Sequence, residues 1–597
     1  MNTWSISTTV RNPERLREFL RVLKLLEGLP FNKTNQIKYQ ELLIQHRLYV
    51  PMNIPPKYSE YYEKPTLDIP FETARSIFEY QKYEDPPMRG RQSVNPLNKL
   101  GFSIARENYG NIIITDLGNK YLTGDYDIGY VFLKSLLKLQ FPNPWSTDFS
   151  ERKGFNVMPL MAALHFIRKV DERFERKGLT QTEFSLFVPT LVNFALIDRY
   201  VDELLKYRES RDKEKFIYNF AKWFYDIKKP TEVQINNFFE YGDNIMRYFR
   251  LTRYFSVTRG AFGSEWRIDV EPSRETEVKL LLEKYNGSAL SFKSKEDYLS
   301  YISDISKPEL PSDNINSVKR IAMALITDIK KMISSNNVPM GAASNDLLNV
   351  NIADKSKREI DSIIAELRNL NIEIKETITK MFLRGNVEQL QNIVRLLRDY
   401  RAIRKLSPEE FEKVVADALI IIDDEINIKA NFPVDDNGEP ISHAPGNRPD
   451  IECFYKSYNA ICEVTLNTSN MQWVSETQPV MRHLREFELK HSKSNSYCLF
   501  IAPKIHGDTL YHFWVSIKHG YNGPTKQKII PMTTEQFAVL LETLIILLQK
   551  GKKLSHVDVE SLYEKIVTET DKVAGYAEWS ASFPGIIDNW RNGLIVR

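Results

Sequence analysis

The stretch Arg448-Pro449-Asp450-Ile451-Glu452, together with Ala460-Ile461-Cys462-Glu463-Val464-Thr465, decides the fold that this sequence predicts. Apolar residues are interspersed with acids in both segments, which is typical of paired strands with one polar face. Only a few residues separate the two segments, and this spacing favours a hairpin. The sequence therefore predicts that the carboxylates of Asp450 and Glu463 come from adjacent strands.

The register of this hairpin determines which side chains share a face. With Lys456 to Asn459 as the turn, Tyr455 pairs with Ala460, and Glu463 lies opposite Glu452. Alternate residues of a strand point to the same face of the sheet. One face then holds Asp450, Glu452, Glu463 and Thr465. Three carboxylates on one face repel each other unless a cation lies among them.

These acids predict a magnesium site. Mg²⁺ prefers carboxylate and water oxygens at about 2.1 Å in an octahedron. We expect Asp450 and Glu463 to bind the ion, and the Val464 carbonyl oxygen to be a third ligand. Bound Mg²⁺ polarises a phosphate and lowers the pKa of a bound water, so the expected chemistry is the cleavage of nucleic acid. The alternative is a hairpin whose acids are simply solvated.

Two further carboxylates are candidates for the same site. Glu412 lies on the helix expected before the hairpin, and Glu476 opens the helix expected after it. For Glu412, an exposed helix acid is the alternative interpretation. Thr465 stands two residues after Glu463, where magnesium nucleases of this kind usually have a lysine. A hydroxyl brings no positive charge, so another residue or a second metal ion has to supply it.

Basic groups that could contact the phosphate or a water follow on the same helix. His483 shares a helix face with Glu476, seven residues earlier, and Arg482 is its neighbour. His443, just before the motif, is another candidate. We count His483 with the four acids as a catalytic candidate.

Residues 406–597 are expected to form an α/β domain around the hairpin. Ser407-Pro408-Glu409-Glu410 is a capping box with proline at the first helical position, and it predicts a helix to about Ile422. The expected strands are 426–430, 451–455, 460–465 and 497–502, and the expected helices are 476–490, 536–549 and 556–568. This order, helix, strand, hairpin, helix, strand, is that of the PD-(D/E)xK nuclease core.

The front of the chain predicts two units that each combine helices with a hairpin. In residues 1–150, strand signals at 101–104 and 111–115 flank the turn residues Asn108-Tyr109-Gly110-Asn111. In residues 151–275, segments 254–257 and 265–268 flank Gly260-Ala261-Phe262-Gly263. Helices followed by a hairpin are typical of winged-helix DNA-binding modules. A small α+β unit without a ligand is the alternative for each.

Residues 276–405 predict a helical linker. Apolar residues recur at three-and-four spacing over 314–334, 355–382 and 387–400. Charge differs on the two sides of it. Counting Lys and Arg against Asp and Glu, residues 1–280 carry +6, whereas residues 421–480 carry −7. A basic front favours contact with phosphates, and an acidic segment favours a divalent cation.

Composition excludes several other classes. No run of 18 apolar residues is present, so we expect no membrane span, and the N-terminal residues show no export signal. Cys453, Cys462 and Cys498 are too few for a disulfide framework, which favours the cytoplasm. No CxxC pair is present, which argues against structural zinc. The cysteines are expected to be small core residues.

At the motif residues, the sequence resembles the AlwI-type restriction endonucleases, a type IIS branch that includes site-specific nicking endonucleases. The resemblance rests on Phe411-Glu412, His443 to Glu452, Cys462-Glu463-Val464-Thr465, Glu476, Pro479 to His483 and Tyr497 to Pro503. It extends forward to Phe132-Leu133-Lys134, Phe141-Pro142 and Arg247 to Arg250, and so covers most of the chain. Cys462 stands where some relatives have glycine.

The resemblance implies an α+β multidomain protein with winged-helix-like recognition subdomains at 1–150 and 151–275, a helical linker at 276–405 and a PD-(D/E)xK cleavage domain at 406–597. It implies a Mg²⁺-dependent endonuclease that binds a short asymmetric double-stranded DNA sequence and cuts at a fixed distance outside it. The catalytic acids of the family map onto Glu412, Asp450, Glu463 and Glu476. Thr465 matches the family, so the missing lysine does not argue against activity.

Candidate DNA contacts follow from this layout. We expect the loop Arg89-Gly90-Arg91-Gln92 to read bases, because Arg pairs with guanine and Gln with adenine in the major groove. Arg89, Arg91 and Gln92 would equally suit phosphate contacts or a solvated loop. Around the second hairpin, the candidates for phosphate contacts are Arg247, Arg250, Arg253 and Arg259.

Two alternatives stay open. One is a strand-specific nicking endonuclease with the same site, because a single catalytic site cuts one strand, and double-strand cleavage needs a transient homodimer or a second subunit. The other is a DNA-binding protein whose nuclease-like domain is not catalytic. The sequence leaves open the recognised bases, the cut offset, the oligomeric state and the number of metal ions.

Overall fold

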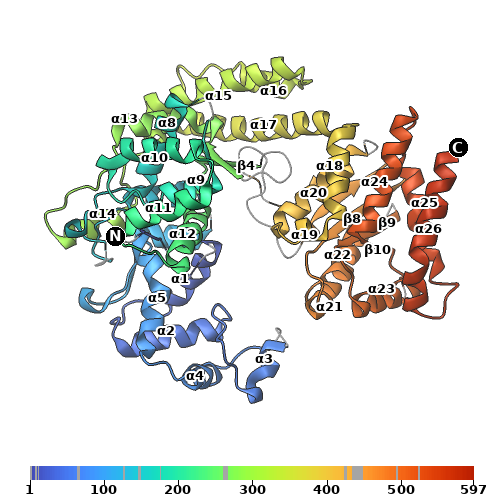
Figure 1. Ribbon diagram of the computed structural model, residues 1–597, viewed down its shortest axis with the longest axis horizontal. Helices are drawn as coiled ribbons and strands as arrows, with labels where there is room; N and C mark the ends of the chain where they lie inside the picture. Colours follow the sequence, from blue (N-terminus) through green and yellow to red (C-terminus); the bar gives the residue numbers. More distant parts are fainter. Residues whose placement is uncertain are drawn as a thin grey trace. The chain divides into compact units, whose positions relative to one another are not determined.

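The computed structural model describes the chain except for residues 1–2, 7–9, 11–12, 64–66, 125–127, 146–148, 175–176, 260–265, 423–426, 433, 435–447, 492–494, 522, 524 and 597. Contacts divide the chain into two compact units (Figure 1). Unit 1 comprises residues 1–328 and 346–367, and unit 2 comprises residues 329–345 and 368–597. The finer division into four domains stays a prediction.

The first part of unit 1 consists of short helices and one small hairpin. Its helices are α1 (Leu16–Lys24), α2 (Lys33–Gln45), α3 (Ser59–Glu63), α4 (Phe71–Tyr80), α5 (Pro86–Lys99), α6 (Asp116–Thr123) and α7 (Ile128–Lys138). The predicted hairpin is present as β1 (Ser103–Ile104) and β2 (Ile113–Ile114), which pair antiparallel. Its turn contains a short 3-10 helix, Glu107–Tyr109.

The prediction of a loop at residues 89–92 is wrong, because these residues lie within α5. Pro86 and Pro87 occupy the first helical positions, where a missing N–H costs nothing. The helix packs closely on α2: a Cβ on Gly90 would lie 2.0 Å from the Gln36 carbonyl oxygen. Ser93 donates a 2.8 Å hydrogen bond to Gln40 across the same contact. Tertiary packing therefore stabilises a helix in a stretch of weak helix propensity.

The second part of unit 1 surrounds a three-stranded antiparallel sheet in the order β3-β5-β4. The strands are β3 (Leu179–Thr180), β4 (Phe255–Arg259) and β5 (Trp266–Val270), and the helices are α8 (Pro159–Arg173), α9 (Gln181–Phe187), α10 (Ile197–Glu209), α11 (Lys213–Tyr225), α12 (Glu232–Arg250), α13 (Glu275–Lys284) and α14 (Lys295–Ser303). The predicted second hairpin is thus present as β4 and β5. Its turn, Gly260 to Gly263, lies outside the described residues.

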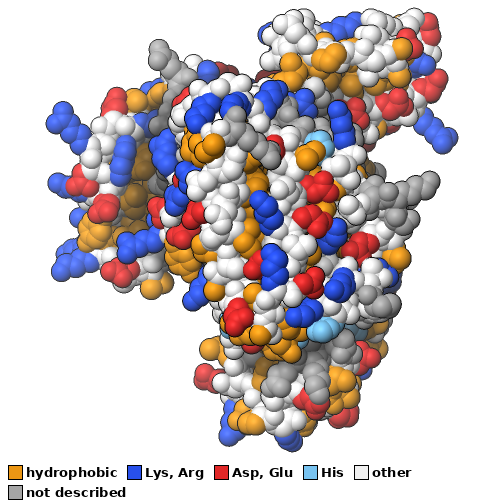
Figure 2. All heavy atoms as spheres, turned by 90° about the vertical axis from the view of Figure 1, so that its right-hand side faces the viewer, with side chains coloured by type: hydrophobic (Ala, Val, Ile, Leu, Met, Phe, Trp, Pro, Cys, Tyr) orange, Lys and Arg blue, Asp and Glu red, His pale blue; other side chains and the backbone are white. Residues whose placement is uncertain are grey.

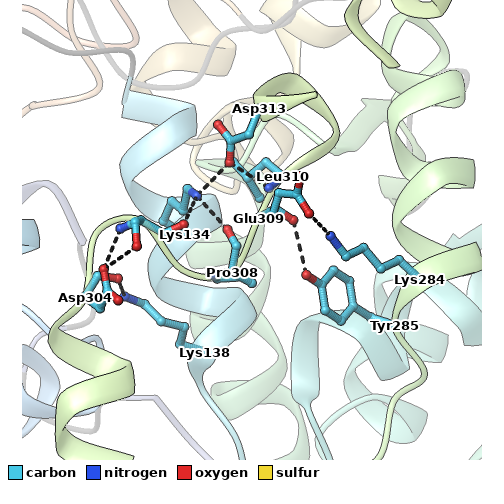
Figure 3. Close-up of polar contacts among 10 residues, drawn as sticks. Lys134, Lys138, Lys284, Tyr285, Asp304, Pro308, Glu309, Leu310 and Asp313 are labelled. Carbon is cyan, nitrogen blue, oxygen red and sulfur yellow. Dashed lines mark hydrogen bonds and ion pairs between the residues drawn. The ribbon is translucent and has the colours of Figure 1, made fainter. Parts of the chain in front are cut away.

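Two buried lysines of α7 bind the segment 304–313, which lies later in unit 1 (Figure 3). The Lys134 ammonium donates to the carbonyl oxygens of Ser306 and Pro308, at 3.3 and 2.6 Å, and lies 3.0 Å from an Asp313 carboxylate oxygen. Lys138 donates to the Asp304 carbonyl oxygen at 2.8 Å, and burial lowers the pKa of Lys138 to about 7. Lys134 is only 1% exposed, so these bonds replace its hydration.

Long helices follow at the positions that the apolar spacing predicts. They are α15 (Ile315–Asn336), α17 (Lys357–Leu383) and α18 (Val387–Arg398). The short helices α16 (Ala342–Leu348) and α19 (Tyr400–Ile403) were not among the predicted ones. The backbone of α15 and that of α17 each pass from unit 1 into unit 2. Within the described ranges, the structure contains no helix with the length and apolar character that crossing a bilayer requires.

Unit 2 contains a five-stranded mixed sheet in the order β10-β9-β8-β7-β6. The strands are β6 (Asn427–Ala430), β7 (Ile451–Phe454), β8 (Tyr458–Val464), β9 (Asn495–Ala502) and β10 (Ile529–Thr533), and the helices are α20 (Pro408–Ile421), α21 (Asn470–Ser475), α22 (Thr477–Lys490), α23 (Gly507–His519), α24 (Thr534–Gln549), α25 (His556–Glu569) and α26 (Tyr576–Val596). Strand β8 pairs antiparallel with β7 and parallel with β9. The expected capping box, Ser407 with Glu410, begins α20.

The predicted register of the β7–β8 hairpin is wrong by two residues. The observed partners are Ile451 with Cys462 and Cys453 with Ala460. The turn is shorter than expected, because the Tyr455 N–H donates to the Tyr458 carbonyl oxygen at 3.0 Å. Tyr458 joins the strand because its ring is buried, with centroids 4.7 Å from Tyr455 and 5.1 Å from Tyr497. A shift of two residues leaves every side chain on the predicted face.

Helices cover both faces of this sheet (Figure 1). On one face, Phe454 contacts Phe487 of α22; on the other, Tyr458 contacts Tyr563 of α25. Coverage on both sides explains why Ile461 and Cys462, adjacent on β8, are both buried. All three cysteines are buried, as predicted. On the side that Figure 2 shows, Lys and Arg side chains lie among Asp and Glu side chains, so this surface has mixed charge.

Candidate active site

Asp450 and Glu463 lie beside each other on one face of the hairpin. In the observed register, the pairing that joins Ile451 to Cys462 places Asp450 opposite Glu463. The Val464 N–H donates to an Asp450 carboxylate oxygen at 2.7 Å. This bond fixes the Asp450 side chain against β8, where the Glu463 side chain is only 9% exposed. The two carboxylates that the sequence singled out therefore form a buried pair.

The pair is electrostatically unfavourable without a cation. Burial raises the pKa of Asp450 well above 3.8, and the Glu463 charge raises it further. Burial likewise raises the pKa of Glu463 well above 4.5, with added repulsion from Glu476 and Glu412. A shared positive ion would relieve both effects, since an opposite charge favours the ionised form.

Glu476 reaches the site from the junction of α21 and α22. The Thr465 hydroxyl donates to a Glu476 carboxylate oxygen at 3.4 Å, and the Ser475 hydroxyl donates to the same oxygen at 3.3 Å. Burial raises the pKa of Glu476, although both hydroxyls oppose the shift. The Thr465 N–H donates to the Ile501 carbonyl oxygen at 3.0 Å, which anchors the residue beside β9.

Glu412 belongs to the same cluster and is not an exposed helix acid. It lies on α20, is 3% exposed, and its charge is among those that raise the pKa of Glu463. Its neighbour Phe411 is in the core of unit 2, which fixes this turn of α20 near the sheet. The structure thus brings together all four acids that the sequence proposed.

His483 contacts the pair from α22. Its Nδ1 lies 2.8 Å from a Glu463 carboxylate oxygen, and the side chain is 6% exposed. When Glu463 is ionised, as metal binding requires, its carboxylate only accepts, so Nδ1 then bears the proton and donates. Arg482 donates to the other ring nitrogen at 3.4 Å. In this arrangement His483 orients Glu463, a different task from the phosphate or water contact expected from the sequence.

The donor set suits Mg²⁺ better than a softer metal. The ligands at hand are carboxylate oxygens and backbone carbonyls, which hard cations prefer. Among the residues that the structure describes, no group of three or more His, Cys, Asp and Glu side chains is arranged so that it could hold a metal ion. Mg²⁺ commonly uses only one or two carboxylates and keeps several waters, so the Asp450–Glu463 pair fits this ion.

The sequence model of the AlwI restriction endonuclease family matches residues 98–540. The chain belongs to this family. The match contains most of unit 1 as well as the four acids and His483. No curated protein sequence matches this chain.

Two solved restriction endonucleases are similar to this AlwI-family protein. The small subunit of the heterodimeric restriction endonuclease R.BspD6I is 25% identical, with a TM-score of 0.28; the match covers 33% of this chain and 98% of the subunit. The restriction endonuclease FokI is 12% identical, with a TM-score of 0.23; the match covers 94% of this chain and 99% of FokI. Both TM-scores are below 0.5, so the family assignment rests on the sequence model.

The three candidate base-reading residues of this restriction endonuclease differ in their surroundings. Arg89 stacks on Tyr83, with the guanidinium carbon 4.4 Å from the ring centroid. Arg91 is held by Asp85 at 2.6 Å and by the Gln36 side-chain oxygen at 3.0 Å. Gln92 is exposed. Arg91 and Gln92 line one cavity of unit 1, and Arg89 is not part of its lining.

The arginines near the second hairpin also differ in exposure and contacts. Arg247 is 52% exposed and pairs with Asp243 at 3.0 Å, one helical turn earlier. Arg250 and Arg253 are half-buried, and Arg253, two residues before β4, has a positive φ of 60°. Arg259 ends β4, and its side chain lies outside the described residues. Arg247 is therefore the phosphate-contact candidate that is most accessible among those described.

The sequence interpretation missed Asn431, which fixes Asp450. The Asn431 N–H donates to the Asp450 carbonyl oxygen at 2.8 Å, and its side-chain amide donates to the Pro449 carbonyl oxygen at 2.9 Å. Both bonds follow from the antiparallel β6–β7 pairing, in which Ala430 faces Ile451. Only knowledge of that register could have identified Asn431, because its residue type alone gives no signal.

Proposed function

We propose that this protein is a Mg²⁺-dependent type IIS restriction endonuclease. It binds a short asymmetric double-stranded DNA sequence and hydrolyses phosphodiester bonds at a fixed distance outside it. The observation that supports this most is the buried Asp450–Glu463 pair, whose pKa values are both raised in the absence of a cation. Membership of the AlwI family supports DNA as the substrate. We assign unit 2 to the PD-(D/E)xK fold and the helix-plus-hairpin parts of unit 1 to winged-helix-like modules.

The carboxylates of Asp450 and Glu463, with the Val464 carbonyl oxygen, would hold the metal ion. Bound Mg²⁺ would polarise the scissile phosphate and lower the pKa of a water molecule. The Val464 N–H and His483 Nδ1 orient the two carboxylates through the bonds of 2.7 and 2.8 Å. These two contacts keep the oxygens in place before DNA arrives, which is the form of preorganisation that a metal site needs.

Glu476 is the candidate for proton transfer. Its raised pKa makes it a stronger base than an ordinary glutamate, and Thr465 hydrogen-bonds the oxygen that would take up the proton. Water oxygen bonds to phosphorus, its proton passes to Glu476, and the bond from phosphorus to the 3′ oxygen breaks. The 3′ oxygen takes a proton from solvent, so the products are a 5′-phosphate and a 3′-hydroxyl.

The division into two units supports cleavage outside the recognised sequence. The acids gather in unit 2, whereas the candidate base-reading residues lie in unit 1. One catalytic site cuts one strand, so cutting both strands requires a second copy or another subunit. The R.BspD6I relative is described as one subunit of a heterodimeric enzyme. A strand-specific nicking endonuclease has the same site and is the alternative function.

Digestion of supercoiled plasmid DNA tests the proposal. We expect cutting with MgCl₂ and none with EDTA, and sequenced ends should map to a constant distance from one short asymmetric sequence. Linear product indicates a double-strand endonuclease, and an open-circular end point indicates a nicking enzyme. A Glu452→Gln variant is the matched control, because Glu452 is a neighbouring acid on the same strand face that faces Ile461. Cleavage that persists in EDTA, or ends scattered without a common sequence, would refute the proposal.

A further inference from the structure

Unit 1 contains a groove of mixed polar and apolar lining between α5 and the β1–β2 hairpin. Its volume is about 420 Å³. Its lining residues are Phe31, Met88, Arg91, Gln92, Val94, Asn95, Asn98, Ala105, Arg106, Glu107, Asn108 and Trp145. Side-chain amides and guanidinium groups dominate the polar part of this lining. The groove is far from the catalytic acids in the sequence and belongs to a different unit.

One row of α5 faces the groove. Met88, Arg91, Gln92 and Asn95 are spaced by three, four and seven residues, which places them on one side of a helix. Gln92 is exposed and Asn95 half-buried. In the part of the chain that the structure describes, the side-chain amides of Gln92 and Asn95 make no hydrogen bond to protein. Both therefore have donors and acceptors available for a ligand.

Asn98, the third side-chain amide of α5, differs from Gln92 and Asn95 because it is hydrogen-bonded to protein. Asn98 accepts from the Ala105 N–H at 3.0 Å and from the Ser103 hydroxyl at 2.8 Å. It also donates to the Ala105 carbonyl oxygen at 2.9 Å. These bonds fasten the hairpin to α5, so Asn98 has a structural role. Asn95, one turn earlier, has no such structural role, so the fold does not account for an asparagine at this position.

The framework around the row is rigid. Gly90 approaches the backbone of α2 so closely that no side chain fits, and Ser93 bonds to Gln40. Arg91 is pre-oriented by Asp85 and Gln36. A helix held in this way presents its exposed row with little loss of conformational freedom on binding, which favours specific recognition.

We propose that this row of α5 contacts the edges of base pairs in the major groove of DNA, and that Asn95 and Gln92 each read an adenine. The inference rests on the proposed endonuclease function. Asn and Gln amides match the N6 donor and N7 acceptor of adenine, and Arg91 matches guanine. The connection between β1 and β2 places Arg106 and Asn108 on the other wall of the groove, where Arg106 donates to the Pro144 carbonyl oxygen.

Selection from randomised duplexes, with binding as the readout, tests this assignment. The parent for the test is the full chain with Asp450→Asn, which separates binding from cutting. We expect Asn95→Ala to lose the preference for adenine at one position of the selected sequence by roughly tenfold to a hundredfold. Asn95→Asp replaces the amide donor with an acceptor, so the preference at that position should shift toward cytosine.

Asn236→Ala is the control, since Asn236 is an exposed asparagine of α12 in the same unit. It should select the same sequence as the parent. Retention of adenine at every position by both Asn95 variants would overturn the inference and leave the endonuclease proposal intact. A parent that selects no sequence, together with an intact chain that cuts none, would overturn both. Equal unfolding midpoints of parent and variants show that the fold is unchanged.

Discussion

The acid cluster of unit 2 and the α5 groove of unit 1 differ in the charge and burial of their side chains. In the first, Asp450 and Glu463 are buried together, and the pKa of each is raised. In the second, Gln92 and Asn95 are neutral, and within the described part of the chain their side-chain amides make no hydrogen bond to protein. In the proposed functions, the cleavage site is prepared by buried charges that need a cation, whereas the base-reading site is prepared by neutral amides that need a hydrogen-bonding partner.

The largest expected effect comes from neutralising the acid pair. Asp450→Asn or Glu463→Gln should lower the rate of plasmid cleavage by at least about a thousandfold, because each removes a proposed ligand of the metal ion. Binding to DNA should persist in the absence of Mg²⁺, as measured by fluorescence anisotropy. Near-normal cleavage by Asp450→Asn would show that the two regions do not differ in the way described.

Removing the orienting histidine should have a smaller effect. His483→Ala leaves Glu463 without its 2.8 Å hydrogen bond. Loss of such a supporting contact typically lowers metal affinity or activity by about 10- to 100-fold. The Mg²⁺ concentration for half-maximal cleavage should therefore rise, and high Mg²⁺ should restore much of the rate. A rate that falls without any change in Mg²⁺ dependence would instead place His483 at the phosphate or the water.

The acid pair should also reduce the stability of the metal-free protein. The pKa of Asp450 is raised in the folded state, so above its ordinary value of 3.8 the native protein binds more protons than the unfolded chain. The free energy of unfolding therefore decreases as pH rises from 3.8 to the raised pKa of Asp450. Above that raised pKa, the full destabilisation by the buried charge is present. Asp450→Asn removes the penalty. At pH 8 in EDTA, the variant should unfold about 2–4 °C higher than the parent, the shift that 1 kcal/mol gives in a domain of this size.

Two comparisons check the origin of that shift. Calorimetric scans at pH 4 should show a smaller difference between the two proteins, because both then have an uncharged side chain at this position. Added Mg²⁺ should raise the unfolding midpoint of the parent and leave that of the variant nearly unchanged. A variant that is less stable than the parent at every pH would contradict the electrostatic account.

The smallest expected effect concerns sequence-independent affinity. Arg247→Ala removes an exposed cation near the second hairpin and should weaken DNA binding by less than about tenfold. The loss should be equal for cognate and random duplexes, and the slope of log affinity against log salt should fall by about 1. The exposed Lys206 of α10 offers a matched control, as Lys206→Ala. A change in the selected sequence would make Arg247 a base-reading residue instead.

The acid cluster was predictable because its signal is local. Alternation along two strands and a short connection place Asp450 and Glu463 on one face, and this result survives a register error of two residues. The register itself depends on Tyr458, which enters β8 because distant rings of Tyr497 and Tyr563 bury it. Such contacts between remote segments leave no trace in the hairpin sequence.

Helix α5 was not predictable by the same means. Two prolines, Gly90 and an internal Pro96 give the stretch the composition of a loop. Its helical state depends on α2, about fifty residues earlier, which packs against Gly90 and bonds to Ser93. The orientation of Asn95 follows from that packing, so the sequence of residues 89–92 alone could not predict the groove.

The buried ammonium group of Lys134 determines where a fragment that carries the proposed recognition part, unit 1, can end. Its partners, at residues 306–313, come after the boundary at 275 that the sequence suggested. A fragment ending at 275 would leave Lys134 and Lys138 without these hydrogen-bond partners. Chimaeras that fuse unit 1 to a foreign catalytic domain should therefore retain the chain at least through Asp313, and earlier junctions should yield insoluble product.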